Sequence, residues 1–396
     1  RYISSIFLNF SMAIKVDKQI KVLSLAFLFI FLGYVGVQQH ITTFFTEKGL
    51  GSLGFTILFI IYLFVAISNP FSAHIIAKIG SKKSMVVSSL FYSMFILSLL
   101  TNSVIIIFIS SALLGIAGSL LWVGQRCYFL KFSKDHLAGR NAGYFSVLMS
   151  LSSILSVFVF SFFVIRYSFD LSFIIFSLFP FAGFILLSFL KETKFSPKND
   201  QLGLFGKYLR NKTILKLATI WFSFTFVIGM AISIIPLNIY HTLGIKYVGG
   251  LSSLFYIFPI FFSYSLGKLS DKKGKTLMVF FSYLIISLGL IALYLGNSPF
   301  FLVMGIVLLA LGSAITNPLT ISLLKDIVVT ENTESLSALF LMAQQAGVLF
   351  AILLFWISQS RIIYLFSVII LFISFIFIVP LFRTHSGFIK VDLEDK

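Results

Sequence analysis

The chain has 396 residues, of which 59% are hydrophobic and 11% charged, and its mean hydropathy is +1.04. An ordinary soluble domain carries about 25% charged residues, so the composition excludes a water-soluble fold. The formal net charge of +17 would suggest a nucleic-acid partner in a soluble protein. In a membrane protein the same excess belongs to cytoplasmic loops, and we expect no nucleic-acid partner. A single cysteine, Cys127, excludes an intrachain disulfide and a cysteine-based metal cluster.

Apolar runs along the chain are long enough to cross a bilayer, which takes about 20 apolar residues for roughly 30 Å of hydrocarbon. Residues 1–21 are predicted to be a cytoplasmic or interfacial N-terminal segment, because their apolar stretch is short and broken by polar residues. Twelve runs follow, at residues 22–45, 54–76, 83–101, 104–131, 140–165, 168–190, 213–240, 248–268, 276–296, 299–324, 335–358 and 361–382. The sequence therefore predicts an all-α membrane protein with twelve transmembrane helices.

The charged residues predict an orientation for these helices. If the N-terminus is cytoplasmic, the outward loops hold only four basic residues, which are Lys48, Arg166, Lys246 and Arg361. The other 26 of the 30 lie in inward loops, tails and helix ends, so the inward side sums to +15 and the outward side to +2. Because positive loops stay in the cytoplasm, we expect both termini there and the protein in the cell membrane.

One long polar connection divides the chain. Residues 191–212 carry many charges together with Pro197, Gly203 and Gly206, and we interpret them as a cytoplasmic linker. The linker separates a predicted six-helix bundle at 22–190 from a second at 213–382, and a cytoplasmic tail follows at 383–396. An internal repeat supports this division, because the loops around Gly80 and Gly274 occupy equivalent places in the two bundles, 194 residues apart.

The second of these loops carries the more informative motif. It matches the pattern G-x-L-a-D-r-x-G-r-k at Gly267, Leu269, Asp271, Gly274 and Lys275, and here the chain resembles the major facilitator superfamily. The first loop keeps its glycine but has Ala77 where the pattern has aspartate. The resemblance implies the major facilitator fold of two six-helix bundles and a cytoplasmic gate. We assign to that gate Gly80, Arg140, Gly267, Asp271, Gly274 and Lys275; the alternative is that Asp271 only solvates a short loop.

A closer resemblance covers about residues 33 to 160. Residues 114–128 and 139–145 are similar to the motifs G-x-A-A-x-L-W-x-x-Q-G-x-Y and G-R-N-x-G-x-F of the uncoordinated-ninety-three-like branch of the superfamily. Arg126 departs from this pattern, since the branch usually has glycine there. Members of the branch include proteins implicated in ion-channel regulation and receptor trafficking, so the resemblance specifies the fold more closely than the activity.

Polar residues inside the predicted spans are the first candidates for a substrate site, because they are costly there unless they face a cavity or another helix. In the first bundle these are Tyr34, Gln38, Gln39, Trp122, Gln125 and Arg126. Tyr34 and Gln38 lie four residues apart and share one helix face, as do Trp122 and Arg126. Two alternatives stay open: Arg126 extends its charge to the membrane interface, and Trp122 is a packing aromatic.

The second bundle adds further candidates, which are Tyr256, Asn317, Gln344 and Gln345. Counting from Ser335, Gln344 lies about 14 Å deep, near the centre of the membrane. The alternative for each amide is an interhelical hydrogen bond, worth about 0.6 to 2 kcal/mol. Substrate sites of secondary transporters lie near the midplane between repeats, so both sets are predicted to meet in a central polar and aromatic cavity.

Several absences in the sequence limit the chemistry. No Asp or Glu lies deep within a predicted span, which disfavours proton coupling through a carboxylate. The phosphate-binding pattern G-x-x-x-x-G-K-[ST] is absent, which excludes primary ATP-driven transport by this chain. We expect no catalytic residue, no cofactor and no metal site, and we do not expect an enzyme.

These observations favour a secondary transporter that moves a small solute by alternating access. Its partners are then an unidentified small-molecule substrate and the lipid bilayer, and we expect a monomer. The first alternative is a membrane adaptor of the same fold that regulates a channel or the trafficking of a partner membrane protein. A weaker alternative, suggested only by the 50 phenylalanines, is a lipid flippase.

Overall fold

Long helices make up the computed structural model, which describes residues 16–132, 138–192, 201–273, 275–296, 298–327, 333–357 and 361–383. The first group comprises α2 (Lys18–Glu47), α3 (Gly51–Ile79), α4 (Ser81–Ser98), the 3-10 turn η1 (Leu99–Thr101), α5 (Val104–Phe132), α6 (Ala138–Arg166) and α7 (Phe169–Ser188). The second comprises α8 (Gln201–Arg210), α9 (Lys212–Ile232), α10 (Ile234–Leu243), α11 (Ile245–Lys273), α12 (Lys275–Leu295), α13 (Pro299–Ile327), α14 (Thr333–Ile357) and α15 (Ile362–Arg383). Within the described ranges no strand occurs.

The spans agree with the number predicted from the sequence. Among the described residues, eleven helical stretches are long and apolar enough to cross a membrane, and one of them, Lys212–Leu243, comprises α9 and α10. Helix α14 contributes a shorter apolar stretch, Ala338–Leu354. The outer surface of the bundle carries large apolar side chains such as Ile105, Phe158 and Phe372, which suits contact with lipid. The predicted all-α membrane fold is confirmed.

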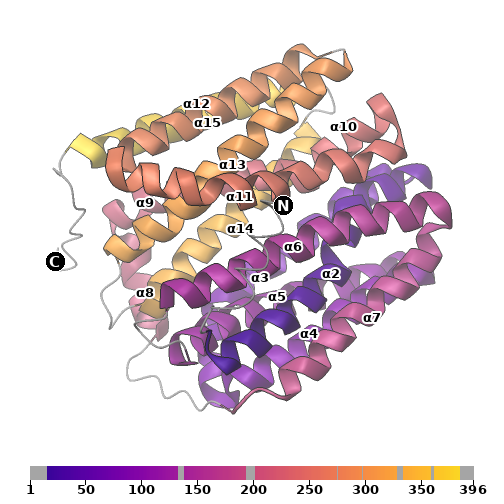
Figure 1. Ribbon diagram of the computed structural model, residues 1–396, viewed down its shortest axis with the longest axis horizontal. Helices are drawn as coiled ribbons and strands as arrows, with labels where there is room; N and C mark the ends of the chain where they lie inside the picture. Colours follow the sequence, from indigo (N-terminus) through magenta and orange to yellow (C-terminus); the bar gives the residue numbers. More distant parts are fainter. Residues whose placement is uncertain are drawn as a thin grey trace, which may run out of the picture.

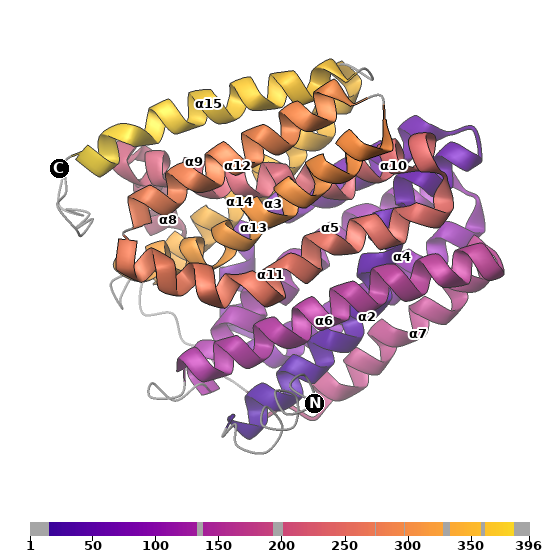
Figure 2. The ribbon, with the colours of Figure 1, turned by 45° about the horizontal axis from the view of Figure 1, so that its top comes forward.

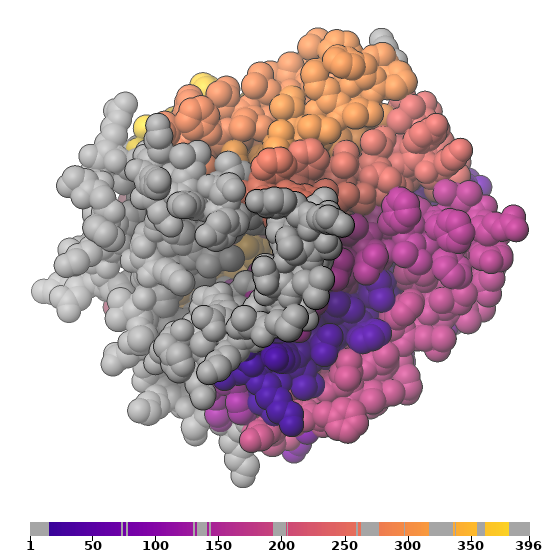
Figure 3. All heavy atoms as spheres, in the orientation of Figure 1, coloured from indigo at the N-terminus to yellow at the C-terminus, as the bar shows by residue number. Residues whose placement is uncertain are grey.

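The helices form two groups that lie side by side (Figures 1 and 2). Helices α2 to α7 surround one buried apolar cluster, and α9 to α15 surround another. Between the groups, α3 packs against α14 and α6 packs against α11, and Figure 3 shows α6 and α11 meeting on the face turned to the viewer. We call the end where α2 begins and α3 finishes the basic end, because Lys18, Lys21, Lys78 and Lys82 lie there. The other end is the far end.

The short repeat loops are tighter than the sequence suggested. We predicted helices ending at 76 and starting again at 83, but α3 runs to Ile79, α4 starts at Ser81, and Gly80 alone connects them. Gly80 has φ +88°, a conformation that residues with a Cβ rarely adopt. Likewise α11 continues to Lys273, beyond the predicted end at 268. Both helices continue because the residues that follow the apolar run are themselves compatible with helix.

The seventh span is not the single helix predicted for 213–240. It is interrupted at Ser233, where α9 ends and α10 begins, and Pro236 lacks the N–H that would bond the carbonyl of Ile232 in a continuous helix. Two carbonyls at this break accept hydrogen bonds from α2: Gln39 Nε2 donates to Ala231 O at 2.6 Å and Thr42 Oγ1 donates to Ser233 O at 3.3 Å. The break thus binds the two helix groups together near the far end.

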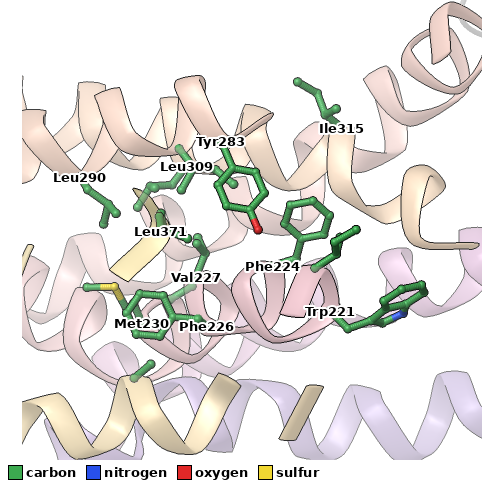
Figure 4. Packing of buried hydrophobic residues seen from close by; sticks show 14 of the residues in the cluster. Trp221, Phe224, Phe226, Val227, Met230, Tyr283, Leu290, Leu309, Ile315 and Leu371 are labelled. Atoms are coloured by element: carbon green, nitrogen blue, oxygen red, sulfur yellow. The ribbon is translucent and has the colours of Figure 1, made fainter. Parts of the chain in front are cut away.

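The core of the second group is built on α9. Trp221 stacks on Phe340 of α14, with ring centroids 4.3 Å apart, and Phe224 contacts Tyr283 of α12 at 5.7 Å. Figure 4 shows the Tyr283 ring of α12 directed toward Phe224 and Val227 of α9. Because these rings lie on different helices, they hold α9, α12 and α14 in fixed positions.

Close packing between α3 and α5 depends on Gly115. A Cβ at this position would lie 2.5 Å from the carbonyl oxygen of Ile61 and 2.6 Å from Cβ of Phe64. A Cβ at Gly118, one turn further along, would be at 3.4 Å from the Tyr92 hydroxyl, which is an ordinary contact. Small residues at such positions let membrane helices approach closely.

We predict that Gly115→Ala destabilises the protein by about 1 to 3 kcal/mol, because the added methyl group forces α3 and α5 apart. The measurement is thermal unfolding of the purified protein in detergent. Gly118→Ala is the matched control and should leave the melting temperature unchanged. Equal melting temperatures for the two variants would contradict the packing described here.

Candidate functional site

Four tyrosines meet near the middle of the bundle: Tyr34 of α2, Tyr62 of α3, Tyr92 of α4 and Tyr256 of α11. The hydroxyl of Tyr34 lies near those of the other three, and the Tyr34 and Tyr92 rings meet edge to face with centroids 5.0 Å apart. At 1.5 Å per residue, Tyr34 lies about 24 Å along α2, a helix of about 44 Å. This tyrosine cluster therefore lies close to the midplane, where the sequence predicted the substrate site.

Gln38 supplies the amide of the cluster. Its Nε2 donates a hydrogen bond to the hydroxyl of Tyr62, and its position four residues after Tyr34 places both side chains on one face of α2. Tyr256 is the contribution of the second helix group, since it packs against the buried clusters of both groups. The structure thus brings together Tyr34, Gln38 and Tyr256, which were predicted separately.

An aromatic wall, formed by Phe27, Phe31, Trp122 and Phe145, continues from the tyrosine cluster toward the basic end. The Trp122 ring lies 5.1 Å from Phe31 and 5.6 Å from Phe27, and Phe27 lies 5.4 Å from Phe145. Phe31 also contacts Tyr92 at 5.8 Å. Trp122 therefore packs against other aromatic rings, as the alternative interpretation of this residue predicts, and it also borders the site.

Several of these side chains are enclosed by protein but not fully buried. Tyr62, Tyr256 and Arg126 are surrounded by protein atoms, yet each retains intermediate solvent exposure. Their polar groups are therefore not completely covered by the protein.

Two further donors lie on α5 beside the aromatic wall. Gln125 is buried, with 7% of its surface exposed, and Arg126 follows it. Within the part of the chain that the structure describes, neither side chain forms a recorded hydrogen bond or ion pair. An amide and a guanidinium group without recorded protein partners have N–H donors free for a ligand.

Two of the remaining amides predicted for the site, Gln39 and Gln345, lie on the contact between the helix groups. Gln39 uses its amide for the bond to Ala231. Gln345 lies on the α14 face of Leu341 and Val348, which packs against the first group. Its Oε1 is buried without a hydrogen-bond partner in the described structure. The backbone carbonyl of Gln344 accepts a bond from Thr225 at 2.7 Å, and the Asn317 side chain lies outside the described residues.

Most predicted gate residues cannot be placed. The side chains of Arg140, Asp271 and Lys275 lie outside the described part of the chain. Gly267 is described only as helical backbone, and Gly274 is not among the described residues. The gate therefore stays a prediction. Next to Arg140, however, Asn141 forms a two-way contact with Asp17, the residue before α2. Asn141 Nδ2 donates to Asp17 Oδ2 at 2.8 Å, and the Asp17 N–H donates to Asn141 Oδ1 at 3.3 Å.

Sequence reasoning missed Tyr62, Tyr92 and Asn141 as site residues. The two tyrosines stood in segments that supported the family resemblance, and a tyrosine within an apolar span was the available signal for both. Asn141 belongs to the motif G-R-N-x-G-x-F, and Asp17 is one of few acids at this end of the chain. Their pairing needed the packing of α2 against α6, which no local pattern predicts.

Metal binding has no support in the described residues, since they contain no group of three or more His, Cys, Asp or Glu side chains that would hold an ion. The site is instead made of phenols, an amide, an indole and a guanidinium group. Such groups bind by hydrogen bonding, stacking and charge, and none is arranged as a nucleophile with a base.

Comparison with known proteins identifies the class that this fold and site define. The chain matches the Major Facilitator Superfamily over residues 20–352, with a further match over 222–392. It belongs to this superfamily, as the motif around Asp271 indicated, and is a multi-pass membrane protein of a class of transporters.

Its similarity to curated relatives is narrower. The chain is 30% identical over 136 residues to the UNC93-like protein MFSD11 of Xenopus laevis, which is 34% of this chain and 31% of the relative. It is 30% identical over 119 residues to UNC93-like protein 3 of Arabidopsis thaliana, which is 30% of this chain and 25% of the relative. The matches thus span a third or less of these relatives. The resemblance to the uncoordinated-ninety-three-like branch is confirmed.

We predict a measurable coupling between Gln38 and Tyr62. Tyr62→Phe removes the hydroxyl that accepts from the amide, and Gln38→Leu removes the amide, so the double variant should lose less stability than the sum of the single variants. The expected coupling energy is about 0.6 to 2 kcal/mol. Thermal or denaturant unfolding in detergent measures it.

Tyr92→Phe serves as the control, because no hydrogen bond of the Tyr92 hydroxyl is recorded in the described structure. Combined with Gln38→Leu, it should give additive losses. Additive losses for Tyr62→Phe as well would mean that the Gln38 bond contributes nothing to the cluster.

Proposed function

We propose that this protein is a secondary transporter that moves a small solute by alternating access through the space bordered by the tyrosine cluster and the aromatic wall. The observation that carries the proposal is the composition of that site. Tyrosines of α2, α3 and α4 meet Tyr256 of the second helix group at mid-depth, and Tyr62 and Tyr256 keep intermediate solvent exposure there. A site shared between the two helix groups binds a solute differently when the groups move.

The contacts between the helix groups support a state that is closed at the far end. Gln39 and Thr42 bond the break at Ser233. On the other face, Gly249 near the start of α11 packs directly on Ser161 near the end of α6. In Figures 1 and 2, α6 and α11 approach at the far end and diverge toward the basic end. On this face the arrangement favours access to the site from the basic end, whereas α3 and α14 stay in contact near that end through Ile76 and Leu341.

We extend the proposal to orientation. The basic residues Lys18, Lys78, Lys82 and Lys131 lie at the ends of α2 to α5 that share the basic end, and positive ends face the cytoplasm. With this orientation both termini are cytoplasmic and the space opens to the cytoplasm. The cell membrane is the location that this topology suits.

A static adaptor of the same fold would have no need for this exposed polar interior. We predict that a crosslink across the far end stops transport. In a Cys127→Ser background, Thr42→Cys and Ser233→Cys are joined by a short thiol crosslinker, which holds α2 against the α9–α10 break. Uptake of a panel of labelled neutral and anionic amphiphiles into liposomes should fall at least about tenfold and return on reduction, because the closed end can no longer open.

The matched control joins two helices of the same group at the same end. Ser98 of α4 and Ser110 of α5 have hydroxyls 2.6 Å apart, and a crosslink between cysteines at these positions should leave uptake intact. Full uptake by the Thr42/Ser233 crosslinked protein would refute alternating access. If the uncrosslinked protein moves no solute of the panel, the adaptor is favoured.

A further inference from the structure

Arg126 lies on the face of α5 that is turned toward the interior. It follows Trp122 by four residues, which places the two side chains about 40° apart around the helix axis. The exposed residue Ile109 lies on another side of α5, about 100° away from Arg126. Around the helix Arg126 lies between Trp122 of the aromatic wall and Val123, which packs with Ile76 of α3 and Leu341 of α14.

Within the described residues no acidic side chain neutralises its charge. The described acidic side chains are Asp17, Glu47, Asp170 and Glu192, and none forms a recorded ion pair with Arg126. Asp17 is engaged by Asn141, and Glu47 and Asp170 lie at the far end. A guanidinium group without a described counter-ion attracts an anion that comes within reach.

Gln125 adds a second donor to this site, which we call the Arg126 site (Gln125 and Arg126). Gln125 is buried, directly precedes Arg126 on α5 and makes no recorded side-chain hydrogen bond in the described structure. A guanidinium group presents a planar fork of donors that matches a carboxylate, and an amide N–H can supply one more bond. Two donors without protein acceptors favour a ligand that brings acceptor oxygens.

Apolar rings lie between the Arg126 site and the tyrosine cluster. Along the helix axes, Arg126 is about 9 Å from the basic end, Trp122 about 15 Å and Tyr34 about 24 Å. Trp122 and Phe31 face each other at 5.1 Å in between. A ligand that extends from the depth of Arg126 past Trp122 toward Tyr34 matches these side chains when it is charged at one end and apolar along its body.

We infer that the substrate is an amphipathic organic anion whose carboxylate binds Arg126 and Gln125 and whose apolar body lies against Trp122 and Phe31. This inference rests on the proposed transport function and names the substrate class of the same site. Arg126 is also the residue at which this chain departs from the motif it otherwise resembles, so the anion preference belongs to this chain.

Binding to the full chain in phosphatidylcholine nanodiscs tests the inference. The probes are 4-phenylbutyrate and its neutral amide, 4-phenylbutyramide, with octanoate and octanamide as a second pair, measured by equilibrium dialysis at neutral pH. The unmodified protein should bind each acid more tightly than its amide. Arg126→Gln should weaken acid binding about 10- to 100-fold, as expected for losing charge-assisted hydrogen bonds, and leave amide binding unchanged.

Two variants act as controls. Arg126→Lys keeps the charge without the fork and should fall between the unmodified protein and Arg126→Gln. Lys83→Gln makes the same charge change at an exposed residue of the basic end and should bind both probes normally. Retained amide binding shows that each variant is folded.

The inference is overturned if Arg126→Gln keeps the preference for the acids, which is the result for an arginine that only extends toward the membrane interface. It is also overturned if the unmodified protein prefers neither acid over its amide. Uptake of the same probes into liposomes is measured separately. A preserved acid preference without uptake would refute the transport function while leaving the Arg126 site in place.

Discussion

The need to satisfy backbone and side-chain polar groups inside the protein, where lipid offers no hydrogen bonds, organises this structure. A continuous helix satisfies its backbone polar groups with its own hydrogen bonds, but the helix break at Ser233 does not. Two carbonyls at the break, of Ala231 and Ser233, accept hydrogen bonds from Gln39 and Thr42, which belong to the other helix group. A defect in one helix thereby becomes the polar contact between the two groups, and its position near the far end determines where they are held together.

The same requirement separates structural polar groups from functional ones. Serines bond carbonyls of neighbouring helices, as Ser152 does with Leu28 and Ser93 with Ser177. Gln125 and Arg126 have no such partner in the described structure, and Tyr62 and Tyr256 of the tyrosine cluster keep intermediate exposure. These groups support the proposal that a solute binds beside them, and the aromatic wall gives the proposed site an apolar side.

Part of the site was predictable because it follows helical periodicity. Tyr34 with Gln38 and Trp122 with Arg126 recur at four-residue spacing, and both pairs border the site. The contribution of Tyr62 and Tyr92 was not predictable, because it depends on how α3 and α4 rotate against α2. Gln39, next to Gln38 in sequence, shows the same limit: one amide bonds within the tyrosine cluster and the other bonds the break in the seventh span.

The sequence by itself determined the membrane class, the number of spans and the superfamily, because hydrophobic length, charge and a short loop motif are local properties. The sequence also showed that Arg126 departs from the motif of the uncoordinated-ninety-three-like branch. Only the tertiary structure decided that the seventh span is broken, that Gly80 alone joins α3 to α4 and that Arg126 has no counter-ion in the described residues. These depend on which side chains helices distant in sequence place beside one another, and the packing of the two groups sets that.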